Sequence, residues 1–466
     1  MNTNKSAVTL LLAFVMAFMA ACSGGGATSG TDPAEEAAPA EKPAEPEPVE
    51  EEPAEEPAED AAAGTSDEFA MDFDLGGREI KVTAWWDIKF EGDHPDVVAI
   101  RENIDELQKK HNFTVSFVTT PYDKMVEQFT SSVMAGEPFA DVVRLERRAA
   151  FPGLVTSGMM TPLNDIMDVD GPQGAFIPEL LKTQVATFNG KLWGFERSYT
   201  DFSGIYYNKN LLKDLGIKDL HEYVEEGNWT WDTFMEVAKQ AVQGGKKGYT
   251  GSKTTLTSLA VVSNGGNYMD LETGKEMLTD PRTLEAFSFV QEMYKSDAGD
   301  FEGDIKQKFT KGEVLMIGGV QWEGEAYMNE LGFGGLGFVP FPLGPQGTEF
   351  KSISNPPNFW VIPKGVKDAD KIVYLMDKIW DIESTEEYPN QNRLEAYFAD
   401  EKDIQAAIQM GQSPAYTVVD NIYIFPTFEI YKLLDQLTIE MLAPATIAEQ
   451  HKQVLQAAID DALKQP

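Results

Sequence analysis

Cysteine and histidine are scarce in this 466-residue chain: there is one cysteine, Cys22, and there are four histidines. One cysteine excludes an intramolecular disulfide, a thiolate zinc finger and an iron–sulfur cluster. The histidines are too scattered for an HExxH helix or a compact metal site. The sequence also lacks a GxSxG elbow and a Walker A loop. We therefore expect no catalytic residue, no metal and no cofactor.

Positive charge is the second deficit. The chain has 38 Lys and Arg against 76 Asp and Glu, which gives a formal net charge of −38. Such a surface repels a phosphate backbone, so we expect no nucleic-acid partner. Apolar residues are not lacking: 42% of the residues are hydrophobic and 11% aromatic. A chain of this length and composition is expected to form two or three domains with proper cores.

The first residues have the pattern of an export signal. Lys5 supplies a positive charge, and Ala7–Ala20 is an uncharged run that is too short for a transmembrane helix. The run ends in Met19-Ala20-Ala21-Cys22, which resembles a lipobox. We interpret residues 1–21 as a lipoprotein signal peptide and Cys22 as the lipidated residue, which anchors the protein to the outer face of the cell membrane. An ordinary secretory peptide beside an incidental cysteine is the alternative.

Residues 22–68 contain a tract rich in proline, alanine and glutamate. Residues 32–68 hold fifteen acidic residues, one lysine and seven prolines. This composition cannot bury enough apolar surface to fold, while proline and like charges keep it extended. We expect a disordered acidic tether.

The chain becomes regular after the tether. Apolar alternation predicts three strands and helical spacing predicts two intervening helices, in the order Glu79–Ala84, Val97–Lys110, Phe113–Val118, Tyr122–Ala135 and Asp141–Leu145. Alternating strands and helices predict a parallel sheet, whose ligand crevice lies beyond the carboxyl ends of its strands. Trp85-Trp86-Asp87 and Glu146-Arg147-Arg148 follow the first and third strands.

The remaining residues are also α/β, with helices in the majority. Further amphipathic helices are predicted at Trp231–Val242, Pro281–Tyr294, Asp368–Trp380 and Ile447–Leu463. Residues 69–466 are too many for one core, so we expect two lobes.

Six short segments resemble, in order, the motifs of family 1 of the extracellular solute-binding proteins, the receptors of ABC importers. They are Gly136–Leu145 (GEPFADVVRL), Asn189–Glu196 (NGKLWGFE), Gly204–Gly216 (GIYYNKNLLKDLG), Asn228–Ala238 (NWTWDTFMEVA), Phe309–Trp322 (FTKGEVLMIGGVQW) and Phe359–Asp370 (FWVIPKGVKDAD). Each is short and degenerate, but they occur in the order of the family, and the resemblance extends over essentially all of residues 72–463. The chain is similar in this respect to maltose-binding and other sugar-binding proteins.

The resemblance implies an α/β, two-lobed periplasmic-binding-protein-like fold of the larger subtype, with a hinge and a ligand cleft between the lobes. It places lobe 1 at residues 69–200 and 352–385, and lobe 2 at residues 204–350 and 390–466. It implies a monomeric receptor that binds a small solute, here expected to be an oligosaccharide, and delivers it to the transmembrane permease subunits of an ABC importer.

Sugars combine apolar faces with hydroxyl edges, so aromatic planes beside polar side chains are typical of their sites. With this chemistry and the positions that the resemblance implies, we predict that Trp322 stacks on the solute. The complete set of predicted ligand-binding residues is Trp86, Asp87, Glu146, Arg147, Tyr199, Asp201, Trp322, Glu323 and Asn358. Near the C-terminus Tyr423, Phe425, Phe428 and Tyr431 are candidates for a further aromatic platform, and no single one of them is selected.

Two other interpretations stay open. Asp87, Glu146 and Asp201 could attract a cationic solute or a peptide in the same fold. Asp87 and Glu146 could instead form the carboxylate pair of a cell-surface glycoside hydrolase, which would need them about 5–5.5 Å apart for a retaining mechanism.

Overall fold

The structure is a computed structural model that describes residues 70–198, 201–270, 273–354, 357–388, 390–412, 417–419, 422, 425 and 427–464. The expected signal peptide, the tether, Cys22, Tyr199 and Tyr423 lie outside these residues. Among the helices that are described, none is both long enough and apolar enough to cross a membrane.

The first sheet has the strand order β13-β3-β1-β2, with β1 (Arg78–Ala84), β2 (Phe113–Thr119), β3 (Val142–Glu146) and β13 (Asn358–Val361). The strand β1 runs parallel to β2 and β3, as the sequence predicts, whereas β13 returns from far along the chain and pairs antiparallel with β3. Val82 and Ala84 on β1, like Val142 and Leu145 on β3, are buried. This sheet therefore has its apolar core on both faces.

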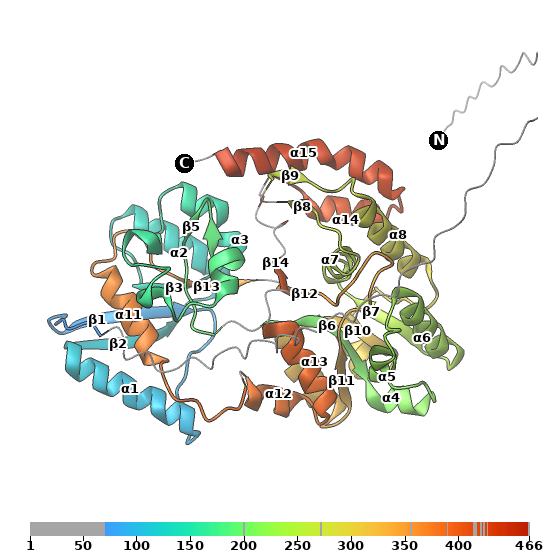
Figure 1. Cartoon of the computed structure of the whole chain (residues 1–466), viewed down its shortest axis with the longest axis horizontal. Coiled ribbons are helices and arrows are strands. Elements are labelled where there is room, and N and C mark those ends of the chain that lie inside the picture. Colours follow the sequence, from blue (N-terminus) through green and yellow to red (C-terminus); the bar gives the residue numbers. More distant parts are fainter. Residues whose placement is uncertain are drawn as a thin grey trace, which may run out of the picture. The chain divides into compact units, whose positions relative to one another are not determined.

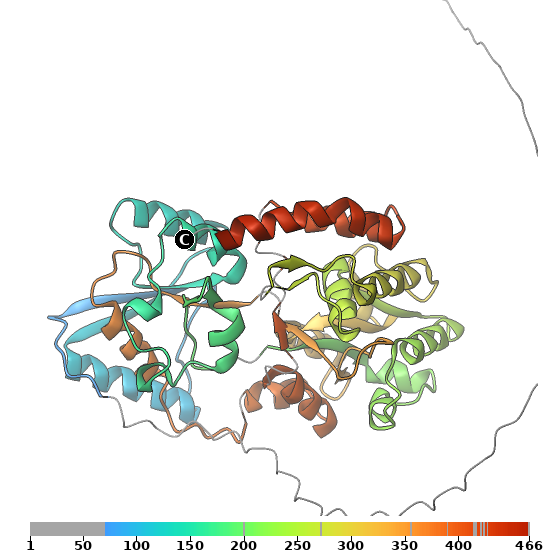
Figure 2. The ribbon, with the colours of Figure 1, turned by 45° about the horizontal axis from the view of Figure 1, so that its top comes forward.

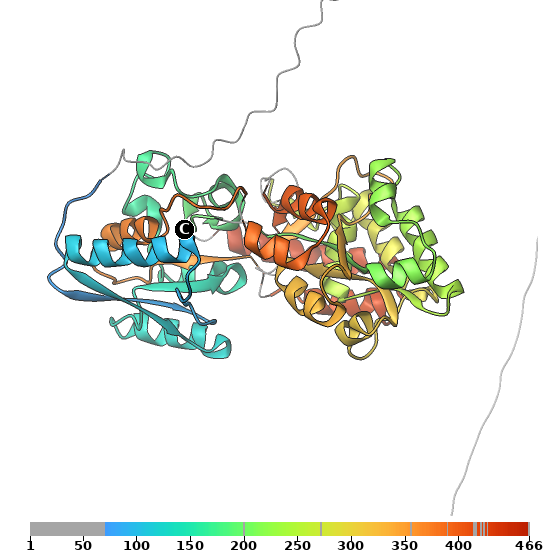
Figure 3. The same cartoon turned by 90° about the horizontal axis from the view of Figure 1, so that it is seen from below.

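Helices cover both faces of this sheet: α1 (Pro95–His111) and α11 (Ala369–Ile379) pack together on one face, and α2 (Tyr122–Met134) lies on the other (Figure 3). The helix α1 begins where His94 accepts a hydrogen bond from the Asp96 backbone N–H, and ends at Asn112, whose backbone is left-handed. Phe129 of α2 and Ile372 of α11 are buried in the core.

The segment that follows β3 is made of short elements. They are α3 (Arg147–Ala149), the π-helical turns Ala150–Leu154 and Leu181–Val185, the 3-10 turns Leu163–Asp165 and Pro172–Gly174, and the hairpin of β4 (Thr187–Phe188) and β5 (Lys191–Leu192).

The second sheet has the order β11-β6-β10-β7, with β6 (Ser203–Asn208), β7 (Lys247–Gly251), β10 (Val314–Val320) and β11 (Leu336–Val339) (Figure 1). The strand β6 runs antiparallel to both of its neighbours, and β10 runs parallel to β7. The carboxyl ends of β7 and β10 therefore meet the start of β6 at one edge of the sheet.

Helices and two short hairpin strands surround the second sheet. They are α4 (Lys209–Asp214), α5 (Leu220–Glu225), α6 (Trp231–Gln243), α7 (Lys253–Ser263), β8 (Met269–Asp270), β9 (Lys275–Glu276), α8 (Pro281–Lys295), α9 (Ile305–Thr310), the 3-10 turn Gln321–Glu323 and α10 (Gly324–Leu331). Thr230 caps α6 and Asp280 caps α8, each through its side-chain oxygen.

The C-terminal part adds α12 (Gln391–Tyr397), α13 (Glu401–Gln412), α14 (Ile430–Thr438) and α15 (Pro444–Lys464). The long helix α15 packs against α8, α14 and β9 (Figure 2). Leu394, Phe398 and Met410 form a buried cluster with Tyr206 and Phe338 of the second sheet.

The nine strands and helices predicted from spacing are all present, with ends that differ by at most three residues.

Serine hydroxyls hold the chain where it passes between the sheets. The strand β12 (Ser352–Ser354) pairs with β14 (Thr417–Val419). The Ser203 backbone N–H donates to Ser352 Oγ at 2.8 Å, and the Ile353 backbone N–H donates to Ser203 Oγ at 2.8 Å. The start of β6 is thereby fixed to β12, four residues before the chain enters the first sheet as β13.

A carboxylate fastens a second connecting segment. Asp96, in the first turn of α1, accepts hydrogen bonds from Ser384 Oγ (2.6 Å), the Thr385 backbone N–H (2.9 Å) and Thr385 Oγ1 (2.8 Å). Burial raises the pKa of the Asp96 carboxyl, but the hydrogen bonds from Ser384 and Thr385 outweigh burial and lower the pKa below its ordinary value. The contact therefore favours the ionised form of the Asp96 carboxyl.

We expect Asp96→Ala to lower the free energy of unfolding by about 1 kcal/mol at pH 7, since the hydrogen bonds are charge-assisted but partly solvated. Because the pKa of Asp96 is lowered on folding, its contribution is present above about pH 4 and is lost as the pH falls through the folded-state pKa. Urea unfolding should show a larger difference from the unmodified chain at pH 7 than at pH 3. Asp105→Ala, at an exposed position on the same helix, should change neither value.

Candidate functional site

Aromatic side chains gather at the carboxyl edge of the first sheet. Trp85 and Trp86 follow β1, and Tyr122 begins α2 directly after β2. The Trp85 ring contacts the rings of Trp86 and Tyr122 edge to face, at centroid distances of 5.0 and 5.7 Å. Trp86 also lies 6.4 Å from the ring of Trp360 on β13. Trp86 and Tyr122 are 41% and 51% exposed, so this aromatic edge presents ring surface to solvent.

A polar triad of Tyr122, Glu146 and Arg148 lies beside these rings. The Tyr122 hydroxyl donates to Glu146 Oε2 at 2.9 Å, Arg148 Nε donates to the same oxygen at 2.6 Å, and Arg148 Nη2 donates to the Tyr122 hydroxyl at 2.8 Å. Burial raises the pKa of Tyr122, so its hydroxyl stays a donor. Burial lowers the pKa of Arg148, but its bonds to Tyr122 and Glu146 outweigh burial and raise it, so the guanidinium stays charged.

Arg144 is also part of this edge, although it is not among the residues predicted from the sequence. Its Nε donates to Asn358 Oδ1 at 2.7 Å, and its guanidinium forms an ion pair with Glu196. The guanidinium carbon lies 5.6 Å from the centre of the Trp86 ring and 5.0 Å from that of Trp360. The available signal was a charged residue inside the apolar run Asp141–Leu145, because a buried cation requires partners.

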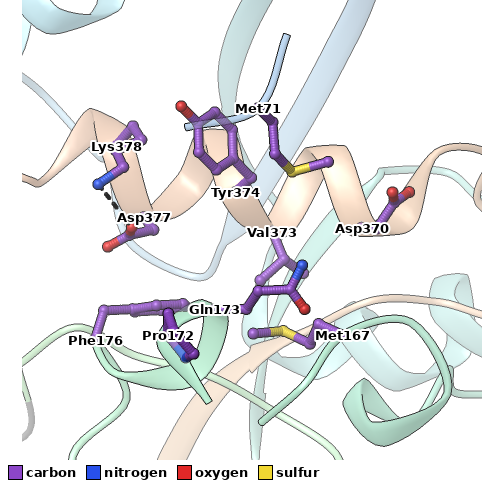
Figure 4. A pocket seen from close by; sticks show the side chains of 10 residues that line it. All are labelled: Met71, Met167, Pro172, Gln173, Phe176, Asp370, Val373, Tyr374, Asp377 and Lys378. Carbon is purple, nitrogen blue, oxygen red and sulfur yellow. Dashed lines mark ion pairs between the residues drawn. The ribbon is translucent and has the colours of Figure 1, made fainter. Parts of the chain in front are cut away.

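A cavity of about 120 Å³ lies against the triad. It is lined by Trp85, Tyr122, Met125, Val126, Arg144, Leu145, Glu146, Arg148 and Ala149. A second cavity, at α11, is much smaller (Figure 4). That one measures about 20 Å³ and is lined by Met71, Met167, Pro172, Gln173, Phe176, Asp370, Val373, Tyr374, Asp377 and Lys378. This volume is little more than the roughly 10–15 Å³ that one water needs, so a solute does not fit there.

The three charges that follow β3 differ in orientation. Glu146 and Arg148 lie in the triad, whereas Arg147 is 2% exposed and its Nε donates to the Val185 carbonyl at 3.0 Å. Its guanidinium carbon lies 5.1 Å from the Phe151 ring. Arg147 therefore faces the core of this part of the chain and is not brought together with Glu146. Asp87 lies on the surface, where it pairs with Lys89 at 2.9 Å.

Trp322 and Glu323 follow β10 at the edge of the second sheet. Trp322 is 62% exposed, and Lys306 Nζ lies 4.7 Å from the centre of its ring. Glu323 holds Lys306 in place through an ion pair of 2.6 Å, and its other oxygen accepts a hydrogen bond from the Val320 backbone N–H. Gly319 is required here, since a Cβ would lie 2.9 Å from the Tyr206 ring and 3.0 Å from the Glu323 carboxylate.

Asp201 lies just before β6, where its carboxylate accepts a hydrogen bond from Ser354 Oγ at 3.0 Å. Of the predicted site residues, Trp86, Glu146 and Asn358 therefore share the first edge, Trp322, Glu323 and Asp201 flank the ends of β10 and β6, and Asp87 and Arg147 face elsewhere. The roles of all of them in binding stay predictions. Among the C-terminal aromatics, Phe425 and Phe428 are buried, whereas Tyr431 is 52% exposed.

Comparison with known proteins gives the family and the fold. A family model described as bacterial extracellular solute-binding protein matches residues 91–377. A search among curated proteins finds no significant match.

Three solved structures illustrate the likeness in fold. The cyclic α-maltosyl-1,6-maltose binding protein from Arthrobacter globiformis has a TM-score of 0.61 at 14% identity, over 83% of this chain and 100% of that chain. UgpB from Mycobacterium tuberculosis, in complex with glycerophosphocholine, has a TM-score of 0.60 at 18% identity, over 82% of this chain and 98% of that chain. The GacH receptor of Streptomyces glaucescens, described without ligand and in complex with acarbose, has a TM-score of 0.58 at 15% identity, over 83% of this chain and 99% of that chain. At these identities the likeness establishes the two-lobed α/β fold.

Proposed function

Because the chain belongs to the family of bacterial extracellular solute-binding proteins, whose members bind small-molecule solutes and work with ABC permeases, we propose that it is the sugar receptor of an ABC importer. In this proposal the receptor is anchored by lipid at Cys22 and binds an oligosaccharide between its two lobes. It then delivers the sugar to the permease subunits. Ligand drives closure of the lobes by contacting both of them at once.

The observation that carries the proposal is the aromatic edge of the first sheet. Exposed ring surface of Trp86 and Tyr122 lies beside a fixed donor and acceptor set, Arg148 and Glu146. Rings supply contact area to the apolar face of a sugar, and ion-paired polar groups that are already oriented bond its hydroxyls at low entropic cost. Trp322 offers a second exposed ring on the other sheet. Two of the three solved structures described above agree with a carbohydrate ligand: the GacH receptor is in complex with acarbose, and the Arthrobacter protein is a cyclic α-maltosyl-1,6-maltose binding protein.

A cationic solute or a peptide is the alternative, and it is less well supported. The three acidic groups that could attract a cation all have partners: Glu146 pairs with Arg148, Asp87 pairs with Lys89, and Asp201 accepts from Ser354. Ion pairing weakens the attraction of Glu146 and Asp87 for a cation, whereas the hydrogen bond from Ser354 occupies one oxygen of Asp201 without neutralising it. The hydrolase interpretation has no support from the family, which consists of binding proteins. Turnover of chromogenic glycosides by the full chain would revive it.

The experiment is a thermal-shift screen of the full chain against mono-, di- and oligosaccharides, with dipeptides and polyamines as the contrasting classes. A ligand at one hundred times its dissociation constant stabilises the folded state by about 2.7 kcal/mol, which raises the unfolding midpoint visibly. We expect at least one oligosaccharide to do so. If only a peptide or a polyamine raises the midpoint, the carbohydrate assignment is wrong while the receptor assignment stands.

A further inference from the structure

The cavity beside the triad is too small for a whole sugar. Its volume is about 120 Å³, whereas pockets that enclose a complete small molecule measure about 300–1,000 Å³. It lies directly against the aromatic edge, with Trp85 and Tyr122 in both its lining and that edge. A solute that stacks on the edge can therefore place one substituent in the cavity.

The floor of this cavity is apolar and its rim is accessible. Met125 and Leu145 are 2% and 1% exposed, and Trp85 and Tyr122 form adjoining walls at 81° to each other. Val126 and Tyr122, at the rim, are 42% and 51% exposed. A hydroxyl group against this apolar floor would lose its hydrogen bonds to water without replacement, whereas a methyl group would bury apolar surface there.

The cavity is also lined by a hydrogen-bond acceptor and by hydrogen-bond donors. Glu146 offers a carboxylate acceptor whose side chain is 8% exposed, and Arg148 offers guanidinium donors on a side chain that is 44% exposed. An amide needs both, since its N–H donates and its carbonyl accepts. A methyl group joined to the carbonyl carbon of an amide, with the nitrogen joined to the sugar ring, is an acetamido group.

We propose that this cavity is a subsite for the acetamido group of an N-acetylated amino sugar, which deepens, and rests on, the proposed sugar-receptor function. The methyl group contacts Met125 and Leu145, the N–H donates to Glu146, and the carbonyl accepts from Arg148. A trimethylammonium group of similar size is disfavoured, because the ion pair with Arg148 neutralises the only carboxylate in the lining.

The test uses two pairs of sugars that differ in the acetamido group, tri-N-acetylchitotriose with cellotriose and N-acetyllactosamine with lactose, titrated calorimetrically into the full chain. We expect the acetylated member of at least one pair to bind about tenfold more tightly or better, since a methyl-sized group in an apolar pocket discriminates by about that factor. Val126→Trp fills the cavity from its exposed rim and should abolish the preference. Met134→Trp, on the same helix at a position 74% exposed and outside the lining, should retain it.

Each other outcome overturns the subsite. If sugars without an acetamido group bind as tightly as their acetylated counterparts, or if Val126→Trp keeps the preference, the subsite is wrong and the sugar receptor stands. If glycerophosphocholine binds and Val126→Trp alone removes that binding, the cavity holds a trimethylammonium group instead. If no sugar of either kind binds in the calorimeter or in the thermal-shift screen, the proposed function fails and the subsite fails with it.

Discussion

Trp322→Ala is expected to weaken oligosaccharide binding about 30-fold or more, which corresponds to roughly 2 kcal/mol or more for the loss of a large aromatic anchor. The indole ring of Trp322 is covered by Lys306 on one face, so that its other face can stack on a sugar. Lys306 lies over its ring at 4.7 Å, and the ion pair with Glu323 fixes Lys306, so the exposed surface of the ring is already oriented. Calorimetric titration of the sugar that is identified by the thermal-shift screen measures the effect.

The control for Trp322 is Phe333→Ala, which removes another exposed ring from the same part of the chain. Phe333 is 68% exposed and lies between α10 and β11. Its removal should leave the affinity unchanged, because loss of exposed aromatic area alone does not affect a remote site. Equal affinities of the Trp322→Ala variant and the unmodified chain would remove Trp322 from the site, while the aromatic edge of the first sheet would still be available.

Asp403→Ala is expected to lower the free energy of unfolding by about 3 kcal/mol, because it removes a buried carboxylate, leaves the Phe338 backbone N–H without its acceptor and leaves Lys209 with only the half-exposed Asp400 as an ionic partner among the described residues. Asp403 is fully buried on α13. Its carboxylate accepts a hydrogen bond from the Phe338 backbone N–H at 2.8 Å, contacts His221 Nε2 at 2.8 Å and pairs with Lys209 Nζ at 2.6 Å. One carboxylate thereby joins α13 to β11, α5 and α4.

Urea unfolding at pH 7 measures the loss, with Glu401→Ala as the control. Glu401 begins the same helix, is exposed, and accepts a hydrogen bond only from Gln405 among the bonds described for it. Its removal should change the free energy of unfolding by at most about 0.5 kcal/mol. If both variants lose a similar, small part of the free energy of unfolding, the Asp403 carboxylate does not stabilise the packing of α13 on the second sheet.

Periodicity along the chain was enough to find the main elements. The helix α2 and the strand β2 follow from apolar spacing alone, because each buries one face over two or more turns or pleats. The short strands β12 and β14 could not be found in this way. Each has three residues, and their pairing joins positions more than sixty residues apart in the sequence, so no local pattern reports it.

The orientations of the side chains around the candidate site were harder to predict than the fold. The rule that ligands lie beyond the carboxyl ends of parallel strands led to Trp86 and Glu146. The same rule gave no means of choosing between Arg147 and Arg148, because the alternation of β3 ends at Glu146 and a helical turn begins. Only the packing of that turn directs Arg147 toward Val185 and Arg148 toward Tyr122. Tyr122 begins the helix that helical spacing predicts, and that spacing carries no information about the partners of its hydroxyl.

The sequence by itself determined the family, the α/β class and the scarcity of metal-binding and catalytic side chains, since these properties depend on residue type, local spacing and motif order. The tertiary structure alone decided which charges neutralise one another and where ring surface stays exposed. Arg144 meets Asn358 across 214 positions and Lys209 meets Asp403 across 194, so their pairing depends on how strands and helices return through the fold. Electrostatic and stacking interactions act over a few ångströms in space, and separation along the chain does not measure that distance.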